Sequence, residues 1–275
     1  MRISIAAVLA ASSLYSSSVL AADLGAPRDA SAYSPAAIVV PADASPRQFY
    51  VRGDVGIARY GFGSFSQPEL TENGGSFISS SIADAATIGA GFGWQLNTRF
   101  RVDLTGEYRA KAAVKGMDNL TGELTVPADA TIQANTLYQG NVSAVAGLVN
   151  GYWDVMKWRG FTPYVGAGIG FAHIRMTDFT FVGAATVQEL GVPDPITHAI
   201  VGVGRQHSQT NLAWALMAGT SYDLSANAKL DLGYRYLNLG SAATSTGLLD
   251  CVCGTIGAPI KISDLDAHEF RMGIR

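Results

Sequence analysis

Charged residues, cysteine and long apolar runs are all scarce in this sequence. Only 15% of the 275 residues are charged, 19 of them basic and 22 acidic, and no cluster of Lys or Arg occurs. Without a basic patch the chain has no electrostatic footprint for nucleic acid, so we expect no nucleic-acid partner. Beyond residue 22 no apolar run reaches the roughly 18 to 20 residues of a membrane-spanning helix. A helical membrane anchor is therefore excluded.

The first 22 residues have the features of a secretory signal. Arg2 precedes an apolar stretch, and the segment ends in the small residues Ala21 and Ala22. A first helix of the fold is the alternative, but serines interrupt its apolar face. Residues 23–47 contain four prolines among alanines, which predicts an extended tether outside the cytoplasm. Residues 48–275 then form the folded domain.

From residue 49 onward apolar and polar side chains alternate, as they do in strands with two unlike faces. The pattern is clear in residues 49–58, 99–109, 228–237 and 269–275. Residues 87–96 and 164–172 instead carry glycine on the face that is charged elsewhere. In parts of residues 141–154 and 211–222, both the odd-numbered and the even-numbered positions are apolar. The sequence therefore does not show which face of these two strands points inward. The sequence thus predicts eight strands.

Short and long connections alternate between these strands. Residues 97–98, 155–160 and 223–227 are short links, whereas residues 61–85, 110–136, 177–209 and 240–264 are long ones. Four structureless loops of that length are out of place in a compact soluble domain, but they are typical of outer-membrane barrels. The predicted fold is all-β, an eight-stranded antiparallel transmembrane up-and-down β-barrel with short periplasmic turns and four long extracellular loops. This fold places the tether in the periplasm.

Two kinds of barrel fit the alternation. A soluble lipocalin-like barrel places its apolar face inward, whereas a membrane barrel places it outward against lipid. Charges of both signs on the polar faces favour the membrane barrel, because they can pair across an enclosed lumen. Aromatic residues near the strand ends predict a girdle at the membrane boundaries: Tyr60, Trp94, Tyr108, Trp153, Tyr234 and Tyr236.

The charged faces predict a network inside the barrel. With eight strands the interior only just holds its side chains, so we expect the network to fix strand register; a narrow water-lined path for small solutes or ions is the alternative. The predicted members of the network are Arg52, Asp54, Arg101, Asp103, Glu107, Arg109, Asp231, Arg235, Glu269 and Arg271.

Three stretches carry a family resemblance. They are residues 162–170 (TPYVGAGIG), the Tyr234-Arg235-Tyr236 strand and residues 270–275 (FRMGIR). Over residues 49–275 the chain resembles the small eight-stranded outer-membrane barrels of the opacity-protein and OmpA-like family, especially its alpha-proteobacterial surface-protein branch. Such chains usually close with an aromatic residue, whereas this sequence stops at Arg275. A weakened insertion signal and a trimmed C-terminus are the two interpretations.

The resemblance implies a location and partners. The location is the outer membrane of a Gram-negative cell, where the barrel-assembly machinery inserts the protein among outer-membrane lipid and lipopolysaccharide. The implied role is envelope integrity and surface interaction, with a possible host or surface ligand at the loops. A porin-like channel is the alternative implied function.

Catalytic and cofactor chemistry have weak support. His173 stands near the expected outer rim, but Arg175 occupies the position where lipid deacylase barrels carry serine, and no Ser/His pair occurs at strand spacing. We therefore expect no enzyme activity and no cofactor. Haem binding through His198 and His207 is a minor alternative.

The two cysteines lie close together in the last long connection. Cys251 and Cys253 lack the second ligand pair of a zinc site, so no metal site is expected. Outside the cytoplasm a disulfide between them is favoured over free thiols, although a bridge across a single residue is strained. We predict a loop disulfide.

Overall fold

The computed structural model describes residues 48–124, 130–244, 247–250, 256–257 and 259–275. The expected signal segment (residues 1–22), the tether (residues 23–47) and both cysteines, Cys251 and Cys253, lie outside these residues. Among the described residues, no helix is long and apolar enough to cross a membrane. The one described helix is short, α1 (Pro68–Glu72).

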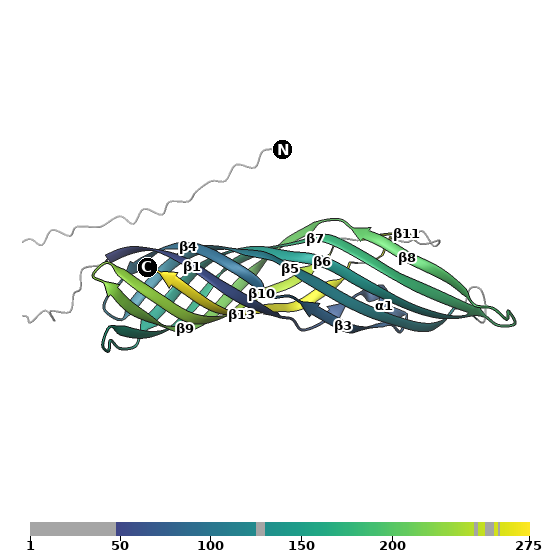
Figure 1. The fold of residues 1–275 in the computed structure, drawn as a ribbon, viewed down its shortest axis with the longest axis horizontal. Helices are drawn as coiled ribbons and strands as arrows, with labels where there is room; N and C mark the ends of the chain where they lie inside the picture. The colour runs from purple at the N-terminus through teal and green to yellow at the C-terminus, as the bar shows by residue number, and fades with distance from the viewer. Residues whose placement is uncertain (1–47, 125–129, 245–246, 251–255, 258) are drawn as a thin grey trace, which may run out of the picture. The chain divides into compact units, whose positions relative to one another are not determined.

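Eight antiparallel strands close into a ring (Figure 1). Each strand pairs with the next along the ring, β7 pairs with β9, and β13 returns to β1, so the ring has no free edge. The predicted eight-stranded fold is confirmed. In ring order the strands are β1 (Gln48–Gly61), β4 (Ala85–Gln95), β5 (Phe100–Leu124), β6 (Ala130–Asp154), β7 (Phe161–Glu189), β9 (His207–Ser225), β10 (Ala228–Ala243) and β13 (Lys261–Ile274).

Short turns join the strands at one end, which we call the short-turn end. At the β4–β5 turn the Asn97 Oδ1 atom accepts hydrogen bonds from the backbone N–H groups of Arg99 and Phe100, each at 2.8 Å. At the β6–β7 turn the chain reverses through Arg159 and Gly160, both with positive φ. The Asn97 side chain therefore satisfies two backbone donors where the ladder ends.

The sequence pattern indicates long connections without structure, whereas in the structure these connections contain strands of their own. Strands β5 and β6 continue past the ring as a long hairpin. β3 (Ser76–Ile82) pairs with β5, and β8 (Ile196–Gly204) pairs with β7. The smaller strands are β2 (Phe65–Ser66), β11 (Gly247–Asp250) and β12 (Ile256–Gly257), which pair with β13, β8 and β11 respectively. We call the projecting sheet the extension; it consists of β3, β8 and the parts of β5, β6 and β7 that continue beyond the ring.

The polarity of the wall inverts where the extension begins. Within the ring, apolar side chains such as Val149 (56% exposed) point outward and charged ones point inward. Past Arg109, in contrast, Ala112 and Val114 of β5 are buried on the inner side, while Lys111 and Lys115 are exposed. On β5 the extension therefore has a mostly apolar inner face and a mostly polar outer face, as expected of a sheet with one solvated side. Val182 of β7 and Val201 and Val203 of β8 are exposed as well.

The outward belt of the ring is rimmed by aromatic side chains at the short-turn end. The exposed members include Phe49, Phe100, Trp153, Trp158, Phe161 and Tyr222. Tyr60 does not belong to a girdle, so that prediction was wrong. Its side chain is 7% exposed and points inward, where the Arg109 guanidinium lies 5.9 Å from the ring centroid. Tyr60 shares the inward parity of Arg52 and Asp54, which outweighs its position near a strand end.

Candidate functional site

Six arginines and six carboxylates are buried inside the ring and pair with one another. Each of these side chains is at most 10% exposed, and the charges of the set balance. Buried charges are costly unless they are paired, and each charge of this set has at least one opposite charge within 4.0 Å. The arginines are Arg52, Arg101, Arg109, Arg235, Arg271 and Arg275, and the carboxylates are those of Asp54, Asp103, Glu107, Asp154, Asp231 and Glu269.

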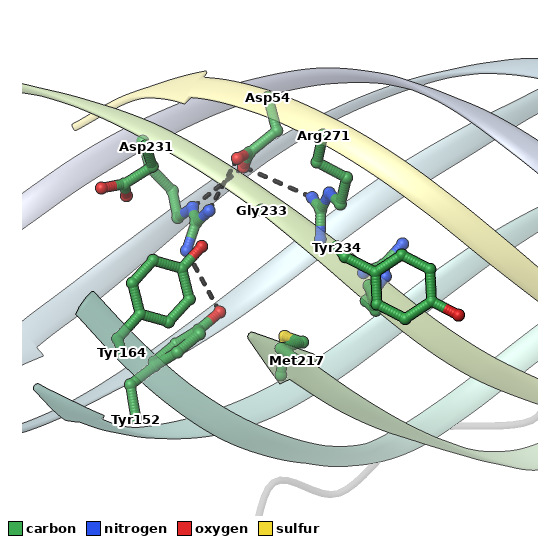
Figure 2. A pocket seen from close by; sticks show the side chains of 10 residues that line it. Asp54, Tyr152, Tyr164, Met217, Asp231, Gly233, Tyr234 and Arg271 are labelled. Carbon is green, nitrogen blue, oxygen red and sulfur yellow. Dashed lines mark hydrogen bonds and ion pairs between the residues drawn. The ribbon is translucent and has the colours of Figure 1, made fainter. Parts of the chain in front are cut away.

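Arg52 of β1 forms the centre of one cluster. Its guanidinium donates to both oxygens of Asp54, at 2.9 and 2.6 Å, and to Asp103 Oδ2 at 2.9 Å. The same group donates to the Tyr152 hydroxyl at 3.1 Å. Asp54 also lies 3.5 Å from the Arg271 guanidinium. The dashed lines at Asp54, Arg271 and Tyr152 in Figure 2 mark the part of this cluster that is drawn there. One arginine thus ties β1 to β5 and β6.

Arg101 of β5 lies between two carboxylates and two aromatic rings. Its guanidinium is 3.1 Å from Asp154 and 3.7 Å from Asp231. The rings of Tyr152 and Tyr164 lie 4.3 and 4.6 Å from its carbon atom. Cation–π contacts of this kind are strongest when desolvated, so the rings stabilise a charge that is 1% exposed.

A quartet of two arginines and two glutamates forms the third cluster. The Arg109 guanidinium contacts Glu107 at 3.0 Å and also contacts Glu269. The Arg235 guanidinium contacts the same two glutamates, with Nε donating to Glu269 Oε2 at 2.7 Å. All four side chains are at most 3% exposed. The quartet joins β5, β10 and β13 across the lumen.

Two inward-facing glycines make room for the long side chains. A Cβ atom at Gly91 would lie 3.1 Å from Arg52 Cγ, and one at Gly166 would lie 2.6 Å from the Tyr152 ring. The glycine faces predicted from residues 87–96 and 164–172 therefore accommodate the arginine and tyrosine side chains of neighbouring strands.

Apolar side chains fill the interior beyond the quartet, toward the extension. Leu237, Leu239, Ile174, Ile262 and Leu265 are each at most 1% exposed and belong to one buried cluster. We call this cluster the apolar plug. Between Arg52, Arg271 and Tyr164 the ionic region leaves a cavity of about 20 Å³, which has room for about one water molecule.

A family profile described as an outer membrane protein beta-barrel domain matches residues 30–274. The chain belongs to this family. This outer-membrane barrel therefore spans the outer membrane with its apolar belt, and by the geometry of such barrels its short turns face the periplasm and the extension faces the cell exterior.

Two curated relatives and one solved structure illustrate the similarity. An uncharacterized protein of Brucella abortus is 29% identical over 82% of this chain and 84% of its own length. The outer membrane protein PagN of Salmonella typhimurium is 27% identical over 77% and 83%. The crystal structure of OprG from Pseudomonas aeruginosa covers 82% of this chain and 93% of its own, with 12% identity and a TM-score of 0.46.

The barrel brings all ten predicted network residues together in its lumen, and it adds others. Asp154 pairs with Arg101, and Asn150 donates to Asp103 Oδ1 at 2.8 Å. Tyr152 joins the Arg52 cluster, and Arg275 lies 3.4 Å from Asp231. On β6, whose inward face the sequence left open, alternate positions carry Asn150, Tyr152 and Asp154. This alternation of polar side chains is the signal that could have identified them as inward-facing.

The histidines of the barrel do not form a joint site among the described residues. His173 faces outward at the belt edge, where its Nδ1 atom lies 2.9 Å from the Thr210 hydroxyl. His198 is on β8 and His207 is on β9. Within the described part of the chain, no group of three His, Cys, Asp or Glu side chains is arranged to hold a metal ion.

Carboxylates outside the membrane have shifted pKa values. Hydrogen bonds from Lys157 and Lys229 lower the pKa of Asp223 at the periplasmic end. In the extension, burial raises the pKa of Asp118, and Tyr138 donates a hydrogen bond of 2.6 Å to it. The two shifts have opposite sign because Asp223 has cationic partners, whereas burial dominates at Asp118 and its hydrogen-bond donors, Thr136 and Tyr138, are neutral.

Proposed function

We propose that this protein is a sealed surface barrel that supports the outer membrane and presents its extension to external ligands. The proposal rests on one observation: the lumen is filled by a balanced ionic network and an apolar plug, while the wall continues outward as a sheet. Beyond its bulge, β5 runs from Ala112 to Leu124, which at about 3.4 Å per residue is roughly 40 Å of strand.

The narrow-channel alternative has less support. A conducting path needs continuous water. The ionic network instead encloses a cavity with room for about one water molecule, and the apolar plug lies beyond it. The role that this filling supports is to hold strand register through ion pairs that cross the lumen. Haem binding and lipid modification have no support from the arrangement of the described histidines.

The surroundings of the barrel follow from its place in the envelope. We propose insertion by the barrel-assembly machinery and contact with lipopolysaccharide in the outer leaflet. Removal of residues 1–22, a periplasmic tether at residues 23–47 and a disulfide between Cys251 and Cys253 stay predictions from the sequence.

Shortening the β5–β6 hairpin tests the surface role. Asn119 and Asn135 lie opposite each other and share a hydrogen bond of 3.0 Å, so residues 120–134 can be replaced by an Asn-Gly turn. We expect cells that display this variant to adhere to epithelial monolayers severalfold less than cells with the intact barrel. Heat-dependent gel migration should be unchanged, because the ring is intact.

A rim variant outside the extension serves as the control for adhesion. Arg59→Gln removes an exposed arginine of β1 and leaves the hairpin whole. Its adherence should equal that of the unmodified protein. Equal adherence of the shortened-hairpin cells, at equal surface amounts, would mean that the extension is not the contact surface.

A further inference from the structure

A hollow lies on the outer wall of the barrel where the apolar belt ends. It has a volume of about 640 Å³, and β5, β6 and β7 form its back. Gly204 and Gln206, at the link between β8 and β9, line it as well. Within the family geometry, this height is the outer-leaflet boundary, at which lipid headgroups meet water.

Irregularities in the strands occur at this height. The β5–β6 register shifts between Arg109 and Ala112, and the β6–β7 register shifts between Gln139 and Asn141. Asp178, on the hollow, has a φ of 56°. Bulges of this kind bend a sheet and re-aim its side chains, so the hollow is a local feature of these three strands.

The back of the hollow carries cationic and hydroxyl groups side by side. Lys111 lies in the β5 bulge, and Ser143 of β6 is directly opposite Arg175 of β7. Ser143 is only 8% exposed. No ion pair within the described part of the chain includes Arg175, whereas Lys111 is 2.9 Å from Asp178.

Apart from Gln206, the other side chains that line the hollow are apolar or already hydrogen-bonded. Tyr108 and Val145 are 48% and 53% exposed and continue the lipid-facing belt. Asp178 accepts hydrogen bonds from Lys111, Thr177 and Asn141. The hollow therefore offers one unpaired guanidinium, a second cation and a buried hydroxyl above an apolar floor.

We propose that this hollow binds the phosphorylated headgroup of an outer-leaflet glycolipid. Arg175 and Lys111 hold the phosphate by charge-assisted hydrogen bonds, and the Ser143 hydroxyl donates a further hydrogen bond to it. The acyl chains of the lipid pack along Tyr108 and Val145 of the apolar belt. A free phosphate would use the cations but leave the apolar floor unused, so the combination favours a lipid. This inference rests on the proposed contact with lipopolysaccharide and gives it a site. The site is separate from the adhesive role, because residues 120–134, which the shortened hairpin lacks, do not line the hollow.

Lipid retention measured by native mass spectrometry tests the site. The refolded protein in detergent is incubated with purified bisphosphorylated lipid A, with dephosphorylated lipid A, with phosphatidylglycerol or with inorganic phosphate. We expect one lipid A to be retained per barrel, with about tenfold or greater loss of affinity in Lys111→Gln/Arg175→Gln. Arg59→Gln, which removes a rim arginine of β1, should bind as the unmodified protein does.

Several outcomes would overturn the site. These are equal lipid A retention by the double variant and the unmodified protein, no retention by the unmodified protein, or equal binding of dephosphorylated lipid A. Retention of inorganic phosphate or phosphatidylglycerol at the same affinity would indicate a general anion site instead. If the double variant does not fold, the comparison of phosphorylated with dephosphorylated lipid A on the unmodified protein decides the question. The shortened-hairpin barrel should retain lipid A whether or not it still adheres.

Discussion

Glu269→Ala is expected to lower the free energy of unfolding by about 3–5 kcal/mol. Glu269 is fully buried and contacts both Arg109 and Arg235. Its removal leaves two guanidinium groups with Glu107 as their main partner, so the lumen acquires an uncompensated positive charge. Urea unfolding of the refolded barrel in lipid vesicles, followed by heat-dependent gel migration, measures the loss.

Two further variants distinguish the effect of an unpaired buried charge from the effect of lost side-chain packing. Asp84→Ala breaks the exposed pair between Arg59 and Asp84, which should cost no more than about 1 kcal/mol. Arg109→Met combined with Glu269→Leu removes one charge of each sign and should recover most of the stability lost in Glu269→Ala. If the double variant is as unstable as Glu269→Ala, the quartet does not act through charge balance.

A positive charge on the outward face of β6 should lower the free energy of unfolding by an amount that depends strongly on its position along the barrel axis. Val149 lies halfway along the outward side chains between Val145 and Trp153, so Val149→Arg places a cation near the centre of the bilayer. The expected loss is about 2–4 kcal/mol. Leu137→Arg lies on the same strand and parity with similar exposure, 51% against 56%, but within the extension. Its expected cost is within about 0.5 kcal/mol.

Unfolding of both variants in the same vesicles gives the comparison directly. The matched strand, parity and exposure leave the surrounding medium as the main difference between the two positions. An equal loss for Leu137→Arg would place the extension in lipid, and a negligible loss for Val149→Arg would place the belt in water. Either result contradicts the assignment of the membrane boundary.

The ring could be predicted from the sequence because two opposite environments act on each strand. Positions that face lipid carry apolar side chains such as Leu104, and positions that face the lumen carry paired charges such as Asp103. Apolar and charged residues therefore alternate clearly along the sequence. In the extension, water replaces lipid on the outer side. The inner side there carries small or apolar residues such as Ala112, so the contrast weakens and changes sign. The strands of the extension were therefore expected as loops.

The network was partly predictable for a related reason. Asp54 and Glu107 stand on strands with clear alternation, and their inward direction follows from parity alone. Asp154 stands on β6, where Ala146 and Leu148 also point inward, so both faces of that strand look apolar. The hollow at Arg175 depends on bulges that bring three strands into a particular register, and no local pattern in the sequence encodes that register.

Conductance in planar lipid bilayers tests the central claim, that the barrel is sealed by its ionic network and apolar plug. Heat-dependent gel migration of the same protein preparation verifies that the barrel is folded. An absence of conductance steps then cannot arise from unfolded protein. The sealed lumen predicts no steps above the baseline of protein-free bilayers. Reproducible ion-selective steps from the folded barrel would contradict it.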